Sequence, residues 1–295
     1  MQIPDELAMS TVWEQLAANA RLVSLPDVYL RLRSVLDDPN TNLADVADVV
    51  GNDPAMSTRL LRIVNSAYFG LGNEIDTISR AVGLLGTQEV HDLVLAAAVA
   101  KSFEGMSSEL MDMQRFWRQG VRRAIIGSEL AVLCNVLDGE RLFVAGLLSD
   151  IGHLYIYQLA PQKAQQAIEL AQVQGIPLYK AEQALLGTDY ARVGGELMRR
   201  WQLPQSLWEP TEFQVEPTGS QEYELFTSLV HIAIHLADGA DKDLDTAICL
   251  AGVWAHAWEV TGLSAAQCGD LSERIESQVD SVTQLMFPAG ESGVA

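Results

Sequence analysis

The sequence predicts an all-α protein, a multi-helix bundle with a helical subdomain at its N-terminal end. Apolar residues recur at intervals of three and four along most of the chain, which is the spacing of an amphipathic helix. No segment shows the alternation of apolar and polar residues that indicates a half-buried strand, and no repeat of fixed period is evident. With 295 residues, 48% of them hydrophobic, the chain can bury a large core.

The first predicted helices are short. We expect residues 1–21 to form a lead-in helix without a chemical motif. An apolar stripe on residues 27–36 predicts the next helix, which ends at the break DDPN (residues 37–40). Residues 43–50 form a further helix, and Gly51 turns the chain toward the helix that follows.

The helix expected at residues 53–65 organises the N-terminal half of the chain. Asp53 can accept hydrogen bonds from the free amides of the first turn, and Pro54 occupies a first helical position, where its missing N–H costs nothing. The helix ends near Asn65, Ser66 and Gly70. Its apolar face consists of Met56, Leu60, Ile63 and Val64. The pattern therefore predicts an amphipathic helix that docks on a core.

The remaining helices follow from the same periodicity and from the prolines, glycines and aspartates at their ends. Residues 87–101 are rich in alanine and valine and should pack tightly, and residues 111–133 should form a long core helix. Residues 103–110 and 214–220 have the composition of connections, and residues 288–295 should fray. The other predicted helices cover residues 77–85, 142–159, 161–174, 178–186, 189–201, 204–210, 223–238, 244–260 and 271–287.

Composition narrows the classes of partner. The chain carries 39 acidic and 19 basic residues, a formal net charge of -20, so its surface repels nucleic-acid phosphates and anionic lipids. Its three cysteines are widely separated and form no CxxC pair, which is typical of reduced thiols. The N-terminus lacks the pattern of a secretory signal, and the longest apolar run, residues 93–100, is too short to cross a bilayer. We expect a cytoplasmic protein with no nucleic-acid or membrane partner.

The segment DPAMSTRLLRIVNSAYFG (residues 53–70) resembles the signature of the HDOD family, the HD-related output domains of bacterial signalling proteins. The segments IDTISRAVGLLG (75–86), AGLLSDIGHL (145–154) and GGELMRRWQLP (194–204) follow in the order that this family shows. The resemblance covers roughly residues 22–240. It implies a helical bundle of the HD type.

The same resemblance implies a domain organisation. The HDOD domain should span residues 22–217, with a helical signature subdomain at about 22–105 and a degenerate HD-like subdomain at about 106–217. Residues 218–295 should supply helices that complete the bundle.

HD phosphohydrolases, to which this family is similar, bind a catalytic metal through a histidine, a His-Asp dipeptide and a later aspartate. By resemblance, Gln119 stands at the first histidine, Ser149 and Asp150 at the dipeptide, and Ile234 at the last position, with Asp238 one turn later. An amide and a hydroxyl are poor substitutes for imidazole, and a divalent cation needs several converging donors. We therefore expect a vestigial site at Gln119, Ser149, Asp150 and Asp238, with no metal, no other cofactor and no catalytic residue.

Two other arrangements could carry chemistry. His231 and His235 lie four residues apart, and Asp238 is three further on, so one helix face could seed a metal site. A residual metallohydrolase could add Asp150 and His153 to that face. The segment at residues 43–66 has the outline of a helix-turn-helix, so a DNA-binding regulator with Arg59 and Arg62 as phosphate contacts is a further alternative.

The resemblance, with the loss of the metal ligands, favours a non-catalytic signal-transduction domain over an enzyme. Such a domain would act through protein contacts, or through a nucleotide-like ligand, at the former active site. The signature helix offers Arg59, Arg62, Asn65 and Ser66 as interaction residues. Partners implied by the family are signalling proteins of two-component or cyclic-di-GMP pathways. The sequence leaves the oligomeric state and the identity of the partner open.

Overall fold

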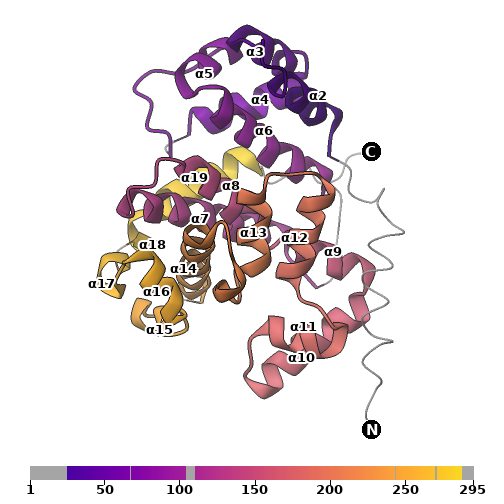
Figure 1. The fold of residues 1–295 in the computed structure, drawn as a ribbon, viewed down its shortest axis with the longest axis vertical. Coiled ribbons are helices and arrows are strands. Elements are labelled where there is room, and N and C mark those ends of the chain that lie inside the picture. The colour runs from indigo at the N-terminus through magenta and orange to yellow at the C-terminus, as the bar shows by residue number, and fades with distance from the viewer. Residues whose placement is uncertain (1–24, 67, 104–109, 243, 270, 288–295) are drawn as a thin grey trace.

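The computed structural model describes residues 25–66, 68–103, 110–242, 244–269 and 271–287 (Figure 1). Every regular element in these ranges is helical, which confirms the all-α prediction. The predicted lead-in helix at residues 1–21 and the predicted fraying tail at residues 288–295 lie outside the described residues.

The N-terminal helices form one end of the molecule, at the top of Figure 1. They are α2 (Asp27–Leu36), α3 (Leu43–Gly51), α4 (Pro54–Val64), α5 (Ile78–Leu85) and α6 (Thr87–Ser102). The predicted start of α4 is confirmed, because the Asp53 side chain accepts a hydrogen bond from the Met56 amide at 2.9 Å. Its predicted apolar face is buried as well. Helix α6 packs against α2, α4 and α5 and also against α8, so it joins this end to the rest of the molecule.

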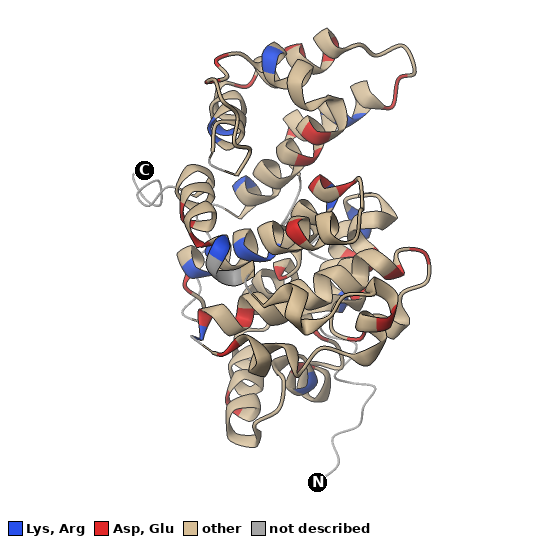
Figure 2. Cartoon of the chain, turned by 90° about the vertical axis from the view of Figure 1, so that its left-hand side faces the viewer, with Lys and Arg blue, Asp and Glu red and all other residues tan. Residues whose placement is uncertain are grey.

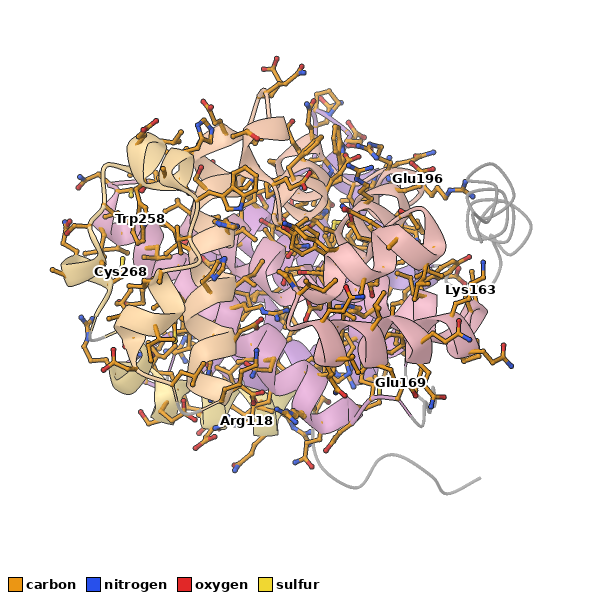
Figure 3. The ribbon with its side chains drawn as sticks, turned by 90° about the horizontal axis from the view of Figure 1, so that it is seen from below. Arg118, Lys163, Glu169, Glu196, Trp258 and Cys268 are labelled. Atoms are coloured by element: carbon orange, nitrogen blue, oxygen red, sulfur yellow. The ribbon has the colours of Figure 1, made fainter. Side chains whose placement is uncertain are left out.

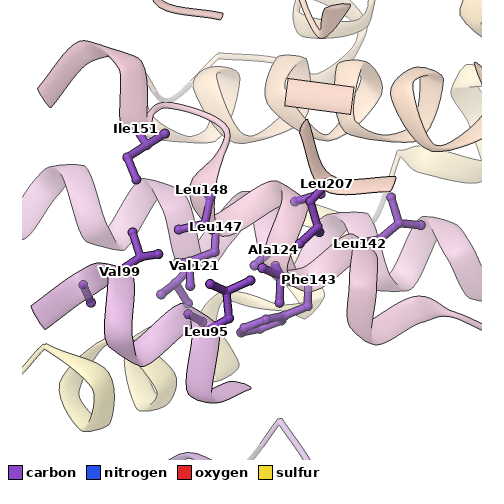
Figure 4. Packing of buried hydrophobic residues seen from close by; sticks show 14 of the residues in the cluster. Leu95, Val99, Val121, Ala124, Leu142, Phe143, Leu147, Leu148, Ile151 and Leu207 are labelled. Carbon is purple, nitrogen blue, oxygen red and sulfur yellow. The ribbon is translucent and has the colours of Figure 1, made fainter. Parts of the chain in front are cut away.

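The centre of the molecule is α7 (Met113–Leu133), which packs against α8 (Gly139–Leu148), α14 (Glu224–Asp241) and α19 (Glu276–Met286). Two glycines allow α7 and α8 to cross closely. A Cβ at Gly146 would lie 2.7 Å from the Arg123 carbonyl oxygen, and one at Gly120 would lie 2.8 Å from that of Leu147. Figure 4 shows the core at this crossing, with side chains from α6, α7, α8, α9 and α13.

Two further pairs of helices complete this half of the fold. Helices α12 (Tyr190–Arg200) and α13 (Gln205–Phe213) pack against each other, α12 also against α9, and α13 also against α8 and α14. Helices α10 (Pro161–Gln174) and α11 (Leu178–Leu186) form a hairpin that projects from the bundle (Figure 1). Lys163 and Glu169 of α10 lie at its outer edge in Figure 3.

The predicted single helix at residues 142–159 is divided. The structure has α8 up to Leu148 and α9 (Ile151–Leu159), with Ser149 and Asp150 as a turn between them. The Ser149 carbonyl accepts a hydrogen bond from the Gln214 side chain at 2.7 Å, so a tertiary contact takes the place of regular helical pairing. Among the described residues, the segment Gly139–Leu159 alone is apolar and long enough to cross a membrane, and 83% of its apolar 18-residue window is buried inside the fold.

The predicted helices at residues 244–260 and 271–287 are also divided. The structure has α15 (Thr246–Leu250), α16 (Ala255–Thr261), α17 (Ala265–Cys268), α18 (Leu271–Arg274) and α19. Between α15 and α16, the Trp254 amide donates to His231 Nε2 at 3.2 Å, and Gly252 packs against the His235 ring. A Cβ at Gly252 would lie 2.7 Å from that ring, so the chain bends here to fit the face of α14. Trp258 and Cys268 belong to this C-terminal group in Figure 3.

The connection at residues 214–220 is packed into the fold rather than exposed. Gln214, Pro217 and Ser220 are buried, and residues Pro217–Gly219 form the short 3-10 helix η1. Glu209 of α13 is 2% exposed and accepts hydrogen bonds from Ser220 Oγ at 2.6 Å and from three successive backbone amides that lead into α14. Burial alone would raise the pKa of Glu209, but these hydrogen bonds lower it to about 2.

Candidate functional site

The candidate site lies where α7, the α8–α9 turn and α14 meet. The structure brings two of the four predicted site residues, Asp150 and Asp238, around one buried guanidinium, that of Arg123 on α7. Arg123 Nη1 forms an ion pair with Asp150 Oδ2 and lies 3.4 Å from Ser149 Oγ, and Nη2 donates to Asp238 Oδ1 at 2.7 Å. A positive charge that belongs to the protein therefore stands between the two carboxylates.

Burial decides how strong this arrangement is. The side chains of Arg123 and Asp150 are 6% and 16% exposed, whereas that of Asp238 is 43% exposed. Burial disfavours the charge on Arg123, but the attraction of Asp150 and then of Asp238 outweighs it and raises the pKa of the guanidinium. Because solvent screens Asp238 more than Asp150, the pair with Asp150 is the stronger contact.

The ion pairs continue beyond Asp150 to the projecting hairpin. His153 Nδ1 lies 3.9 Å from Asp150 Oδ1, and Nε2 lies 3.3 Å from Oε1 of Glu182, a fully buried residue of α11. Burial lowers the pKa of His153, but Glu182 and Asp150 together raise it above its usual value. The His153 ring stacks on Tyr190 of α12, with centroids 4.0 Å apart. Alternating charges thus link α11, α9, α7 and α14.

Of the other two predicted site residues, Ser149 lies at the edge of the Arg123 cluster, and Gln119 bonds to a different arginine. Gln119 Oε1 accepts a hydrogen bond from Arg122 Nη1 at 3.1 Å. Ser149 Oγ donates to the Gly146 carbonyl at 2.8 Å, as a hydroxyl at a helix end commonly does. Sequence reasoning placed these residues by position along the chain, and the structure shows that their polar atoms do not join the two aspartates in a common donor set.

The residues present do not fit the divalent metal of the HD phosphohydrolases. Such a metal would need donors in the space between Asp150 and Asp238, and Arg123 fills that space with a cation. Among the residues that the structure describes, no group of three histidine, cysteine or acidic side chains converges as metal ligands do.

In the alternative metal site at His231, His235 and Asp238, side chains also form other contacts. His231 Nδ1 lies 2.6 Å from the Gln214 carbonyl, and Nε2 accepts the Trp254 amide, so backbone groups occupy both ring nitrogens. Burial and then the neighbouring His235 lower the pKa of His231 to about 4, which keeps the ring neutral. Asp238 turns to Arg123. Although the three residues share a helix and line the same cavity, they are not among any group of potential metal ligands in the described part of the chain.

The four interaction residues of the signature helix have different roles. Asn65 donates to the Leu61 and Ile75 carbonyls at 2.9 and 2.7 Å and accepts the Ile75 amide at 2.7 Å, so it fixes the loop after α4. Ser66 is buried, and Arg59 Nη1 donates to the Ala97 carbonyl of α6 at 3.3 Å. Arg62 is exposed.

Helices α3 and α4 do follow each other as in a helix-turn-helix, but Arg59 is turned toward α6, and only Arg62 of the two proposed phosphate contacts is exposed. On the face drawn in Figure 2, basic residues of the N-terminal helices are few and lie among acidic ones. This mixture of charges does not favour the DNA-binding alternative, which would use a basic patch.

A cavity of about 590 Å³ opens beside the Arg123 cluster. Residues of α7, α9, α11, α12, α14 and α15 line it, together with the segment before α16. Its inner part includes Arg123, Asp150, Gln214 and His231, and its rim includes Ile248 and Trp254, which are 62% and 39% exposed. This volume lies within the range of small-molecule sites.

Three residues of this site were not singled out from the sequence: Arg123, Glu182 and Gln214. Arg123 had a usable signal, since it lies one helical turn after Gln119 and therefore on the same face of α7 as the position expected for a metal ligand. Glu182 comes from a segment without any motif. Gln214 stands in a segment where related metal-binding proteins carry histidines, but its amide gave no signal of its own, so the fold places both residues here.

The order and packing of these helices define an all-helical domain of the HD and HDOD type. The sequence profile of the HDOD domain matches residues 22–217, and the chain belongs to the HDOD domain family.

Solved structures share this fold over nearly the whole chain. A protein of Shewanella amazonensis, provisionally named a phosphohydrolase, is 26% identical, with a TM-score of 0.75 over 94% of this chain and 98% of that one. An HDOD domain protein of unknown function from Geobacter sulfurreducens is 20% identical, with a TM-score of 0.74 over 95% and 97% of the two chains. A protein of Marinobacter aquaeolei, provisionally named for signal transduction, is 19% identical, with a TM-score of 0.72 over 96% of this chain and 65% of that one.

One curated sequence is also similar. An uncharacterised protein of Treponema pallidum is 24% identical in an alignment of 252 residues that covers 81% of this chain and 48% of that protein. The chain thus spans about half the length of the curated relative it matches.

Proposed function

We propose that this protein is a non-catalytic signal-transduction domain, which acts by binding a signalling protein or a nucleotide-like ligand at a scaffold that has exchanged its metal for an internal cation. One observation carries the proposal: the buried Arg123 guanidinium stands between Asp150 and Asp238. A metal ion at this place would activate water and neutralise developing charge. A guanidinium can neutralise charge, but it has no open coordination position for a water molecule and stays protonated.

The names of two structural neighbours give opposite indications of whether this protein is an enzyme. The provisional phosphohydrolase name of the Shewanella protein favours an enzyme, and the provisional signal-transduction name of the Marinobacter protein favours a regulator. The side chains of this chain support the regulator. A cytoplasmic location and partners from two-component or cyclic-di-GMP pathways belong to the same proposal.

The test is a combined metal and hydrolysis measurement on tag-free protein that has met neither chelator nor nickel resin. We expect substoichiometric iron, manganese and zinc by elemental analysis. We also expect no hydrolysis of cyclic di-GMP or bis(p-nitrophenyl) phosphate with added Mn²⁺ or Mg²⁺. Metal-dependent hydrolysis that Asp150→Ala abolishes would overturn the proposal, provided that the control variant Asp48→Ala, at an exposed position of α3, retains it.

A further inference from the structure

The rim of the cavity beside Arg123 exposes apolar side chains to solvent. Leu244, Ile248 and Trp254 line the cavity and are 44%, 62% and 39% exposed. All three lie on the stretch that runs from the end of α14 through α15 to the residue before α16. Single exposed apolar residues are ordinary, but a group of them around one opening is typical of a surface that another molecule covers.

The α10–α11 hairpin supplies a second part of the rim. Pro177, which precedes α11, is exposed, and Tyr179 in the first turn of α11 is half-buried; both line the same cavity. The hairpin projects from the bundle, where it packs against α9 and α12 (Figure 1). The cavity has a volume of about 590 Å³, which exceeds that of any single side chain. Apolar groups that enter it are therefore removed from water beside both parts of the rim.

The chain beside the rim is strongly acidic. The run DGADKDLD (residues 238–245) has four aspartates and one lysine, and Leu244 of the rim lies within it. The side chain of Asp238 lines the cavity and is 43% exposed, and Asp245 is exposed at the start of α15. Basic residues that approach the rim would meet these carboxylates.

The arginines around this run do not cancel its acidity. Arg115 pairs with Asp241 of the run, and Arg123 is shared between Asp238 and Asp150. Because one guanidinium serves two carboxylates, acidic groups still outnumber basic ones in this part of the rim.

The charge of the whole chain acts in the same direction. On the hairpin the charges balance: Lys180 lies 5.8 Å from the centre of the Tyr179 ring, and Glu216 contributes, after burial, to the raised pKa of Tyr179. The formal net charge of the chain is -20, so long-range attraction speeds the approach of a basic partner. A second copy of the chain, or an anionic nucleotide, would instead approach a surface of its own sign. The apolar rim and its acidic surroundings together select a partner that is apolar and basic.

We propose that this rim docks a basic amphipathic segment of a partner protein. Apolar side chains of the segment enter the cavity beside the hairpin and α15, and its lysines or arginines pair with Asp238 and Asp245. The inference rests on the proposed function and deepens it, because it selects a protein rather than a nucleotide-like ligand and states the chemistry of the segment that docks.

The experiment measures the fluorescence anisotropy of two dye-labelled peptides of about 14 residues, each titrated with the full chain. Both peptides have leucines on one helical face, and the remaining positions are lysine in one peptide and glutamate in the other. We expect saturable binding of the leucine–lysine peptide, with a dissociation constant below about 100 µM at about 50 mM salt. The leucine–glutamate peptide should bind at least about tenfold more weakly, and higher salt should weaken binding of the basic peptide.

One pair of variants locates the apolar contact. Ile248→Ala should weaken binding of the leucine–lysine peptide at least about fivefold, as truncation of a central apolar contact does. Leu84→Ala is the matched control and should leave binding unchanged. Leu84 is 55% exposed, and it belongs to α5, which lies at the other end of the molecule from α15 (Figure 1).

A second pair of variants tests the charge. Asp245→Asn removes a carboxylate but keeps the cap of α15, since an asparagine oxygen accepts the Ala247 amide as Asp245 does at 2.7 Å. It should weaken binding of the basic peptide about twofold to fivefold at low salt. Asp48→Asn, at an exposed position of α3, should leave binding unchanged. All four positions are exposed, and thermal melting checks that each variant is folded.

Several results would refute the inference. Binding weaker than about 100 µM, or binding that Ile248→Ala and Leu84→Ala reduce equally, would show that the rim is not a docking site. Equal binding of the leucine–glutamate peptide would refute the basic character of the partner. Displacement of the basic peptide by about 1 mM cyclic di-GMP would assign the rim to a nucleotide. A dimer of the chain that Ile248→Ala dissociates in analytical ultracentrifugation would assign it to a second copy. All of these results leave the metal and hydrolysis test of the proposed function unchanged.

Discussion

Replacement of Arg123 by methionine is the most direct test of the internal-cation interpretation. Methionine keeps the length and the apolar stem of the side chain but removes the charge, so Asp150 stays buried without its cation. Breaking a buried ion pair in this way costs about 3–5 kcal/mol. The contact with the half-exposed Asp238 adds less than about 1 kcal/mol. We therefore expect Arg123→Met to lower the free energy of unfolding by about 3–5 kcal/mol at pH 7.

The assay is equilibrium urea unfolding, with the midpoint followed by circular dichroism. Arg115→Met is the matched control, because Arg115 also lies on α7 and pairs with an aspartate, Asp241, but its side chain is 63% exposed. It should cost less than about 1 kcal/mol. Adding Asp150→Asn to Arg123→Met should restore about 1–3 kcal/mol, since it removes the orphaned charge. A loss no larger than that of Arg115→Met, or no recovery in the double variant, would refute the reasoning.

Three other predictions concern stability. Glu209→Gln should lower the free energy of unfolding by about 2–3 kcal/mol at pH 7, because the folded pKa of Glu209, about 2, lies below its usual value of 4.5. This loss of stability should disappear as the pH falls toward about 2. Thermal melts of the variant and the wild type at pH 7 and about pH 3 test it. Gly152→Ala should lower the free energy of unfolding by about 3 kcal/mol, because the added Cβ would lie 1.9 Å from the Tyr190 carbonyl oxygen. Gly83→Ala, at an exposed position of α5 where the Cβ would meet no atom within 4 Å, should raise it by about 0.5–1 kcal/mol. Chemical unfolding of both variants tests this. Because the pKa of His153 is raised in the folded state, its ion pairs add stability that is fully present below pH 6.5 and is lost as the pH rises through the folded pKa. His153→Gln should therefore make the melting temperature fall less steeply between about pH 6 and pH 9. An unchanged slope would contradict the His153 ion pairs.

The sequence predicted the fold well where local signals agree with the tertiary contacts. Asp53, Pro54 and the apolar face of α4 give such a case, because the cap and the periodicity both act within one helix. The predictions failed at helix breaks that distant residues impose. Nothing in the apolar run 142–159 indicates that the Ser149 carbonyl pairs with Gln214, and nothing in 244–260 indicates that the Trp254 amide pairs with His231.

The candidate site was predictable only in part for the same reason. A motif comparison places Asp150 at a ligand position and Asp238 one turn beyond Ile234, which stands at the last one, but it follows the ligand positions and ignores the residues around them. The compensating charge comes from Arg123, one turn beyond Gln119, and a comparison limited to ligand positions does not reach it. A search for a new cation on the same helix face would have found it.

The chain of charges explains what stabilises the two aspartates in this fold. Without a cation, Asp150 would be a buried, uncompensated carboxylate at the junction of α7, α8 and α9, and such a group destabilises the fold by several kcal/mol. Arg123 removes that cost from within the chain, because it pairs with Asp150. The aspartates are then held by their structural role, and their presence in this or a similar sequence is not in itself evidence of catalysis. Arg123 is the residue to test first, because its guanidinium lies between the two carboxylates and pairs with both of them.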